Sequence, residues 1–266
     1  MASKGRVIKS MSNLTESSYR HMIARGEVAD AHTEVAYGEL TSTAAATHHI
    51  LHPTALGPDL NIIDPAGVQI TLVSTSAEDG AGTLTGILQV DIHYLDSNLD
   101  ERREEVTLNG TTAVTTVADD IRHIQCIHGI DFGSTGAAVG NITLSNGGTD
   151  YAVIVANDRR CTSSVRRVPR GKKLVITDVW GGSTSGTGQV ESTIRLGGTF
   201  INEHHDLTET GNFFPFMGIA TQNAAQALHT GTPLIIPEAR IVAMEVDVGA
   251  TGCNVVAGYA GYYEPA

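Results

Sequence analysis

Three histidines that could bind a metal ion stand close together at His48, His49 and His52. Imidazole is a good ligand for zinc or nickel, but a closed zinc site also needs a fourth ligand and a rigid frame. Prolines, beginning with Pro53, follow this segment and restrict the backbone to extended or turn conformations. We therefore interpret the three histidines as structural or solvent-exposed residues, and we expect no metal there.

A second group of potential ligands, Glu203-His204-His205-Asp206, lies near the end of a predicted strand. Adjacent side chains on a strand point to opposite faces, so at most two of the four can converge on one ion. We interpret this group as polar residues of a surface or an interface.

The segment Asp96-x-Asn98-x-Asp100 copies the first three ligand positions of a calcium loop. Glu101 then stands where such a loop needs glycine, and Thr107 stands where it needs a bidentate glutamate. The segment therefore predicts the solvated tip of a hairpin and not a calcium site.

No pattern in the sequence indicates a catalytic apparatus or a cofactor site. The glycine-rich run 181–188 lacks the lysine of a phosphate-binding loop, and the nucleophile-elbow pattern GxSxG does not occur. Aromatic residues could line a sugar platform, but in a β-sandwich they more commonly form the core or a subunit interface; they include Trp180, Phe213, Phe214, Phe216, Tyr259, Tyr262 and Tyr263. We expect a protein that is not an enzyme and that needs no cofactor.

The three cysteines, Cys126, Cys161 and Cys253, are isolated and odd in number. They cannot build a disulfide framework or a zinc knuckle. Cys126 alternates with Ile124 along an apolar run, which predicts a buried free thiol. We expect a reducing compartment.

The net charge is -12, yet the basic residues are concentrated in two places. Such clusters suit contacts with an acidic neighbouring protein. They suit nucleic acid less well, because the overall charge repels phosphate and no aromatic residues interleave with them. No membrane partner is expected either, since the apolar runs are short. The candidate interface residues are Lys4, Arg6 and Lys9 near the start, and Arg166, Arg167, Arg170, Lys172 and Lys173, which we expect to be mostly solvated.

The pattern of apolar residues predicts an all-β protein. Along residues 88–94 and 242–248, apolar and polar residues alternate with the period of a strand that has one buried face. Strand candidates follow one another every 8–12 residues or so with turn residues between them, which is typical of antiparallel sandwiches or jelly rolls. We predict two β-sandwiches, over residues 67–158 and 159–266, with one large jelly roll as the alternative.

Residues 1–66 differ from the rest, because they are rich in small residues, basic charge and proline. Apart from one short helix from about Leu14 to Arg25, they predict an extended N-terminal arm. We expect this arm to contribute little to the fold and to lie on a neighbouring subunit, with an ordinary mobile terminus as the alternative.

Two blocks of the chain resemble structural proteins of tailed-bacteriophage virions. The first is Leu88 to Thr116, in which an alternating strand and an acidic loop lead into the sequence VTLNGTT, and which we interpret as a β-meander. The second is Val168 to Ile176, where Pro169 would preset φ and Gly171 would take a left-handed turn position. Proteins of this kind are all-β, often oligomeric and without catalytic residues.

The resemblance implies a location in the virion, after assembly in the host cytoplasm. The interpretation that follows is a capsid decoration (cement) protein that holds the head together through contacts with the major capsid protein or other virion subunits. It would form a homo-oligomer, for which a trimer is our expectation. A neck, tail or fibre component of the same virion is the close alternative, and a carbohydrate- or receptor-binding module is the third.

Overall fold

The structure is a computed structural model, and it describes residues 16–42, 46–57, 60–82, 85–185, 191–198, 214–222, 225–249 and 252–266. The all-β prediction is confirmed: the described residues form antiparallel strands in four sheets, with one α-helix, α1 (Glu16–Ala24), and one short 3-10 helix, η1 (Thr54–Leu56). Among the described residues, no helix has the length and apolar character that a membrane span requires.

Two of the sheets form an N-terminal sandwich. One sheet has the strand order β6-β3-β8-β9, and the other has the order β5-β4-β7. Their facing sides enclose one apolar core, which includes Leu72, Ile92 and Ile127. The strands are β3 (Thr71–Ser74), β4 (Ile87–Asp96), β5 (Glu101–Thr107), β6 (Val114–Thr115), β7 (Ile121–Phe132), β8 (Ile142–Asn146) and β9 (Thr149–Ile154).

The other two sheets form a C-terminal sandwich with longer strands. One sheet has the order β1-β16-β11-β14, and the second has the order β10-β15-β12-β13, with β2 also paired to β15. The core between them includes Leu174, Met244 and Tyr259. The strands are β1 (His32–Ser42), β2 (Ala46–Ile50), β10 (Arg166–Arg167), β11 (Lys172–Ser185), β12 (Glu191–Gly198), β13 (Phe214–Gln222), β14 (Ala225–Ile236), β15 (Ile241–Val248) and β16 (Cys253–Pro265).

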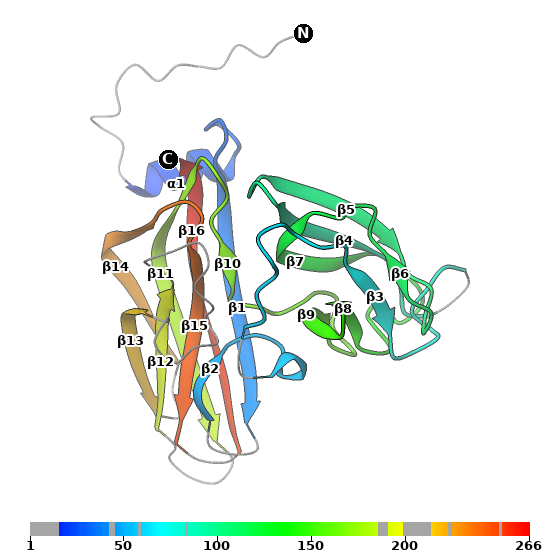
Figure 1. Ribbon diagram of the computed structural model, residues 1–266. Coiled ribbons are helices and arrows are strands. Elements are labelled where there is room, and N and C mark those ends of the chain that lie inside the picture. Colours follow the sequence, from blue (N-terminus) through cyan, green and yellow to red (C-terminus); the bar gives the residue numbers. More distant parts are fainter. Residues whose placement is uncertain are drawn as a thin grey trace.

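The N-terminal sandwich is inserted into the C-terminal one. The chain enters the C-terminal sandwich with β1 and β2, builds β3 to β9 as a separate body, and then returns for β10 to β16 (Figure 1). The two bodies lie side by side, with β10 of one in contact with β7 of the other (Figure 1). The prediction of two sandwiches, in preference to one large jelly roll, is confirmed.

The predicted extended arm over residues 1–66 is wrong for residues 32–50. Strand β1 pairs with β16 over eleven positions, from His32 opposite Tyr263 to Ser42 opposite Cys253. Its inward-facing residues Ala36 and Leu40 belong to the core of the C-terminal sandwich. The predicted helix is confirmed as α1, whose Ile23 packs against the outer face of the same sheet.

The predicted β-meander over Leu88 to Thr116 is only partly right. Strands β4 and β5 pair as expected, but β6 pairs with β3 in the opposite sheet. The turn at Asn109-Gly110 therefore carries the chain from one sheet of the sandwich to the other. Gly110 has a φ of 59°, and a Cβ there would lie 2.9 Å from the backbone of Ala77, so the crossing needs glycine at this position.

Candidate functional site

A block of four polar residues lies on the outer face of the sheet β5-β4-β7, at the junction of the two sandwiches. Asp91 and His93 are two residues apart on β4, and Cys126 and His128 are two residues apart on β7. Side chains at this spacing share a face of a strand. In the register, His93 is opposite Cys126 and Asp91 is opposite His128, so the four form a two-by-two cluster.

A β-bulge at Gln125 brings Cys126 onto this face. The register steps from His93 opposite Cys126 to Tyr94 opposite Ile124, which leaves Gln125 as the extra residue. Ile124 packs against the core of the N-terminal sandwich, whereas Cys126 faces the junction. Cys126 therefore does not share the face of Ile124, and it is only half-buried, so the prediction of a buried thiol there is wrong. All three cysteines are free, as predicted.

Asp91 is the buried member of the cluster, and its carboxylate lies close to both imidazoles. Its side chain has no exposed area, and its Oδ2 lies 2.7 Å from Nε2 of His93 and 3.4 Å from Nε2 of His128. Arg103, opposite His93 on β5, pairs with the same carboxylate. Burial alone would raise the pKa of Asp91, but the hydrogen bonds from Arg103 and His93 outweigh it, and the pKa is lowered. Asp91 is therefore an anion that orients two imidazoles.

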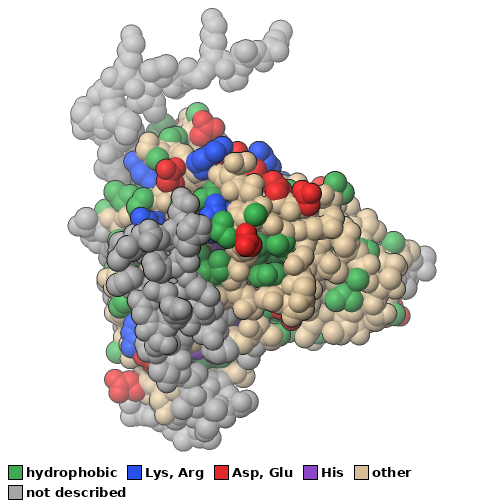
Figure 2. Space-filling model, viewed as in Figure 1, with side chains coloured by type: hydrophobic (Ala, Val, Ile, Leu, Met, Phe, Trp, Pro, Cys, Tyr) green, Lys and Arg blue, Asp and Glu red, His purple; other side chains and the backbone are tan. Residues whose placement is uncertain are grey.

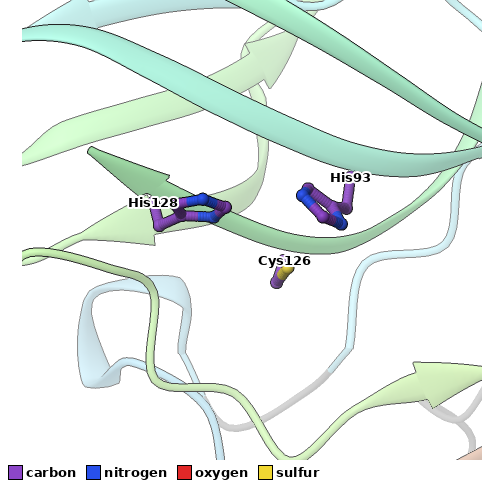
Figure 3. A group of neighbouring side chains, drawn as sticks. All are labelled: His93, Cys126 and His128. Carbon is purple, nitrogen blue, oxygen red and sulfur yellow. The ribbon is translucent and has the colours of Figure 1, made fainter. Parts of the chain in front are cut away.

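Three members of the cluster could bind one metal ion. His93, Cys126 and His128 each offer a ligand atom, and these atoms lie within 4.8 Å of one another (Figure 3). Within the described part of the chain, no other group of histidine, cysteine or carboxylate side chains is arranged in this way.

The cluster opens into cavities between the sandwiches. One, of about 540 Å³, is lined by His93, Cys126 and residues of the C-terminal sandwich such as Glu34 and Tyr263. Another, of about 530 Å³, is lined by Cys126 and His128. Burial raises the pKa of the Cys126 thiol, and it lowers the pKa of His128 more than the charge of Asp91 raises it.

Two of the predicted interface arginines lie inside the junction and not on its surface. Nε of Arg166 donates to Glu34 at 2.7 Å, and these two side chains are 11% and 16% exposed. Burial would lower the pKa of Arg166, but the charge of Glu34 raises it. Arg167 is 1% exposed, and its backbone exchanges two hydrogen bonds with the side chain of Gln125. The expectation that these two arginines are solvated is wrong.

The other basic residues of this segment pair with acids. Arg170 lies 2.9 Å from Asp100, and Lys172 pairs with Glu101, so both bridge the two sandwiches. Lys173 lies 3.4 Å from Glu264 on β16. Figure 2 shows basic and acidic side chains intermixed along the upper edge of the molecule. The other three interface candidates, Lys4, Arg6 and Lys9, lie outside the described residues.

The ligand groups considered from the sequence do not form a site in the described residues. His49 and His52 are buried with ring centroids 6.3 Å apart, and Nε2 of His52 bonds to the carbonyl of Gly57 at 2.8 Å. The Asp96 carboxylate accepts the backbone N–H groups of Asn98 and Asp100, which closes the predicted hairpin tip. The His48 side chain, the segment 203–206 and residues 186–188 of the glycine-rich run lie outside the described residues.

Comparisons with known proteins give only weak matches, and these are to solved structures. No model of a known protein family matches the chain, and no curated protein matches it. A structure of infectious bursal disease virus, Gx strain, is similar with a TM-score of 0.20 and 9% identity, covering 88% of this chain and 71% of that one. The VP2 subviral particle of the same virus gives 0.14 and 12%, covering 89% and 80%. Scores this low are at most a weak resemblance to capsid proteins and carry no argument about this chain.

Proposed function

We propose that the protein is a non-enzymatic structural component of a virus particle, specifically a decoration (cement) protein on the head of a tailed bacteriophage. The observation that carries the proposal is the junction, where the ion pairs Arg170–Asp100 and Lys172–Glu101 and the hydrogen bonds between Arg167 and Gln125 join the two sandwiches into one two-lobed body. A protein that holds shell subunits together transmits force through its own fold. Rigidity between its lobes is therefore a requirement of that role.

The connections between the sandwiches support this stiffness. Domains joined by an ordinary linker are expected to move relative to one another. Here the returning segment is bonded on both sides: Cys161 N–H donates to Ile127 on β7 at 2.9 Å, and Ser164 N–H donates to Leu51 at 2.9 Å. Leu51 N–H donates in turn to Met244 on β15 at 2.8 Å. The segment 155–165 is thus hydrogen-bonded to both sandwiches and does not form an ordinary flexible linker.

The turn that resembles phage virion proteins supports the more specific part of the proposal. Gly171 has a φ of 71°, as the resemblance implies for the turn after Pro169. This turn places Arg170 and Lys172 where they pair with Asp100 and Glu101 of the other sandwich. The residues that carry the resemblance therefore also build the junction.

In this role the protein would bind the major capsid protein or other virion subunits and assemble as a homo-oligomer, with a trimer as the expected state. Attachment would come from interface area removed from water, which for stable complexes reaches roughly 1,600 Å² in total. A neck, tail or fibre position in the same virion would use the same stiffness, at a lower copy number.

Cryo-electron microscopy of purified particles of the virus that encodes this chain tests the proposal. We expect many symmetry-related copies on the outside of the shell. A ring of few copies at one vertex would replace the decoration role with a neck or tail role. Particles that lack the protein altogether, as judged by mass spectrometry, would contradict any virion role.

A further inference from the structure

We propose that His93, Cys126 and His128 bind a divalent cation of the zinc class in the cleft between the two sandwiches, with Asp91 as the residue that orients the imidazoles. The inference is independent of the virion role. It rests on the placement of four side chains by the β4–β7 ladder and on the chemistry of the donor set.

The donor set selects the metal. One thiolate and two imidazoles suit zinc, or copper among the redox-active metals, and they suit calcium and magnesium poorly because those ions take oxygen ligands. Zinc binds sulfur at about 2.3 Å and imidazole nitrogen at about 2.0–2.1 Å, usually in a tetrahedron. The three ligand atoms already lie within 4.8 Å of one another, so rotations of the side chains suffice to close them around an ion.

The strands hold the ligands in place. His93 and Cys126 are direct cross-strand partners, and His128 is two residues beyond Cys126 on the same face (Figure 3). Ligands on paired strands are more precisely positioned than ligands on loops. The Gln125 bulge places Cys126 and His128 on the outer face of the sheet, while Ile124 faces the core, and Gln125 is itself fixed by its two hydrogen bonds to Arg167.

Asp91 supplies the supporting shell that metal sites of this kind use. A histidine that binds metal through one ring nitrogen commonly donates its other N–H to a carboxylate, which fixes the tautomer and the orientation of the ring. Asp91 lies 2.7 Å from Nε2 of His93 and 3.4 Å from Nε2 of His128. In this arrangement Asp91 can hold one ring nitrogen while the other binds the metal.

The charge balance of the cleft allows a cation to bind. Two of the positive groups nearby are matched by acids, since Arg103 pairs with Asp91 and Arg166 pairs with Glu34, and Arg160, which lines the same cavity as His128, donates to the Tyr37 hydroxyl at 2.7 Å. Metal binding would release the proton of the Cys126 thiol to solvent and leave a thiolate bound to the ion. The three protein ligands leave a fourth position for water, as in open zinc sites, and the adjoining cavities give solvent access to it.

Titration of the full-length, metal-free protein with cobalt(II) tests the proposal, because a thiolate bound to cobalt gives a charge-transfer absorption that zinc does not. We expect this absorption to saturate at one cobalt per chain and to disappear when zinc is added. Zinc should also raise the melting temperature and slow the alkylation of Cys126. Failure to see the cobalt–thiolate absorption in the folded protein would overturn the proposal.

Variants assign the ligands. Cys126→Ser should abolish the absorption, His128→Gln should weaken cobalt binding strongly, and Asp91→Asn should weaken it by about 10–100-fold. Two matched controls, Cys253→Ala in the core of the C-terminal sandwich and His21→Gln on α1, should leave the titration unchanged. If Cys126→Ser does not fold, protection of Cys126 from alkylation by zinc in the unaltered chain, located by mass spectrometry, decides. An absorption that survives Cys126→Ser, or an alkylation rate that zinc does not change, would overturn the assignment.

Discussion

The two sandwiches differ in how the chain builds them. The N-terminal sandwich comes from one continuous stretch, with β3 to β9 following one another between residues 71 and 154. The C-terminal sandwich is assembled from two stretches separated by that whole domain, because β1 and β2 precede it and β10 to β16 follow it. The first can therefore fold from its own segment, whereas the second depends on pairing between its two distant parts.

The difference extends to what the two bodies present at their junction. The N-terminal sandwich contributes acids on the β4–β5 hairpin and the cluster around Asp91, and the C-terminal sandwich contributes the arginines and lysines that precede and begin β11. The basic segment therefore helps to hold together the two sandwiches of its own chain.

Removal of β1 and β2 should have the largest effect. A chain that starts at Pro65 should lose cooperative folding of the C-terminal sandwich, because it lacks the eleven paired positions of β1 on β16 and the core residues Ala36, Leu40 and Leu51. The N-terminal sandwich should stay folded. Hydrogen exchange followed by mass spectrometry, peptide by peptide, distinguishes the two bodies.

A peptide covering residues 28–52, added to the shortened chain, serves as the control for this deletion. It should restore exchange protection in β16 and β15, the strands that pair with β1 and β2. If the shortened chain keeps full protection in β16 without the peptide, the dependence of the C-terminal sandwich on its N-terminal part is refuted.

Loss of the charge on Glu34 should have the next largest effect. Glu34→Gln leaves the guanidinium of Arg166 buried without its ionic partner, and breaking a buried pair in this way costs about 3–5 kcal/mol of stability. Glu101→Gln is the matched control, because the pair of Glu101 with Lys172 is more exposed and should cost below about 1 kcal/mol. Urea denaturation of both variants measures the difference; equal losses would show that burial does not make the Arg166–Glu34 pair, which joins β10 and β1 of the C-terminal sandwich, more stabilising than an exposed pair.

A fall in pH should lower the free energy of unfolding by a smaller amount, through protonation of His52. Burial, and to a lesser extent the charge of His49, lowers the pKa of His52 to about 4 in the folded protein, from about 6.5 when unfolded. The unfolded chain therefore binds the proton first, and stability should be lost as the pH falls from about 6.5 to about 4, on the order of 3 kcal/mol from this residue.

The variant His52→Gln isolates this contribution, since its amide can still donate to the carbonyl of Gly57. Its free energy of unfolding should depend less steeply on pH between about 6.5 and 4 than that of the unaltered protein. Identical slopes in the two proteins would mean that His52 does not set the acid sensitivity.

The parts of the fold that follow the simple strand period could be predicted from the sequence. Val90, Ile92 and Tyr94 face the core of the N-terminal sandwich as their alternation indicates. In β15 the face predicted to be buried is buried. The opposite face is predicted to be exposed, but its residues Ala243 and Glu245 are buried. Glu245 is compensated by Arg195 on β12 at 2.9 Å, a partner that local alternation cannot reveal.

Two features escaped sequence reasoning for identifiable reasons. The sequence of strand β1 resembles that of an arm because its inward positions include Ala36 and Gly38, which give little apolar signal. A Cβ at Gly38 would lie 2.0 Å from the carbonyl oxygen of Leu51, so close packing requires the small residue. Strand alternation alone does not predict the polar cluster, because a bulge at Gln125 changes the face of Cys126. The spacing of Ile121, Ile124 and Ile127, which does not fit a period of two, was the available signal.

The insertion of one sandwich into the other sets the order of events during synthesis. His32 leaves the ribosome early, but its partner Tyr263 is made 231 residues later, which at 5–20 residues per second is a wait of about 10–50 s. During that interval the N-terminal sandwich can fold, while β1 remains a single strand with unpaired N–H and C=O groups. The newly made chain therefore passes through a stage in which one finished lobe carries a strand that can pair with β16 of its own chain or, on a crowded polysome, with β16 of a neighbour.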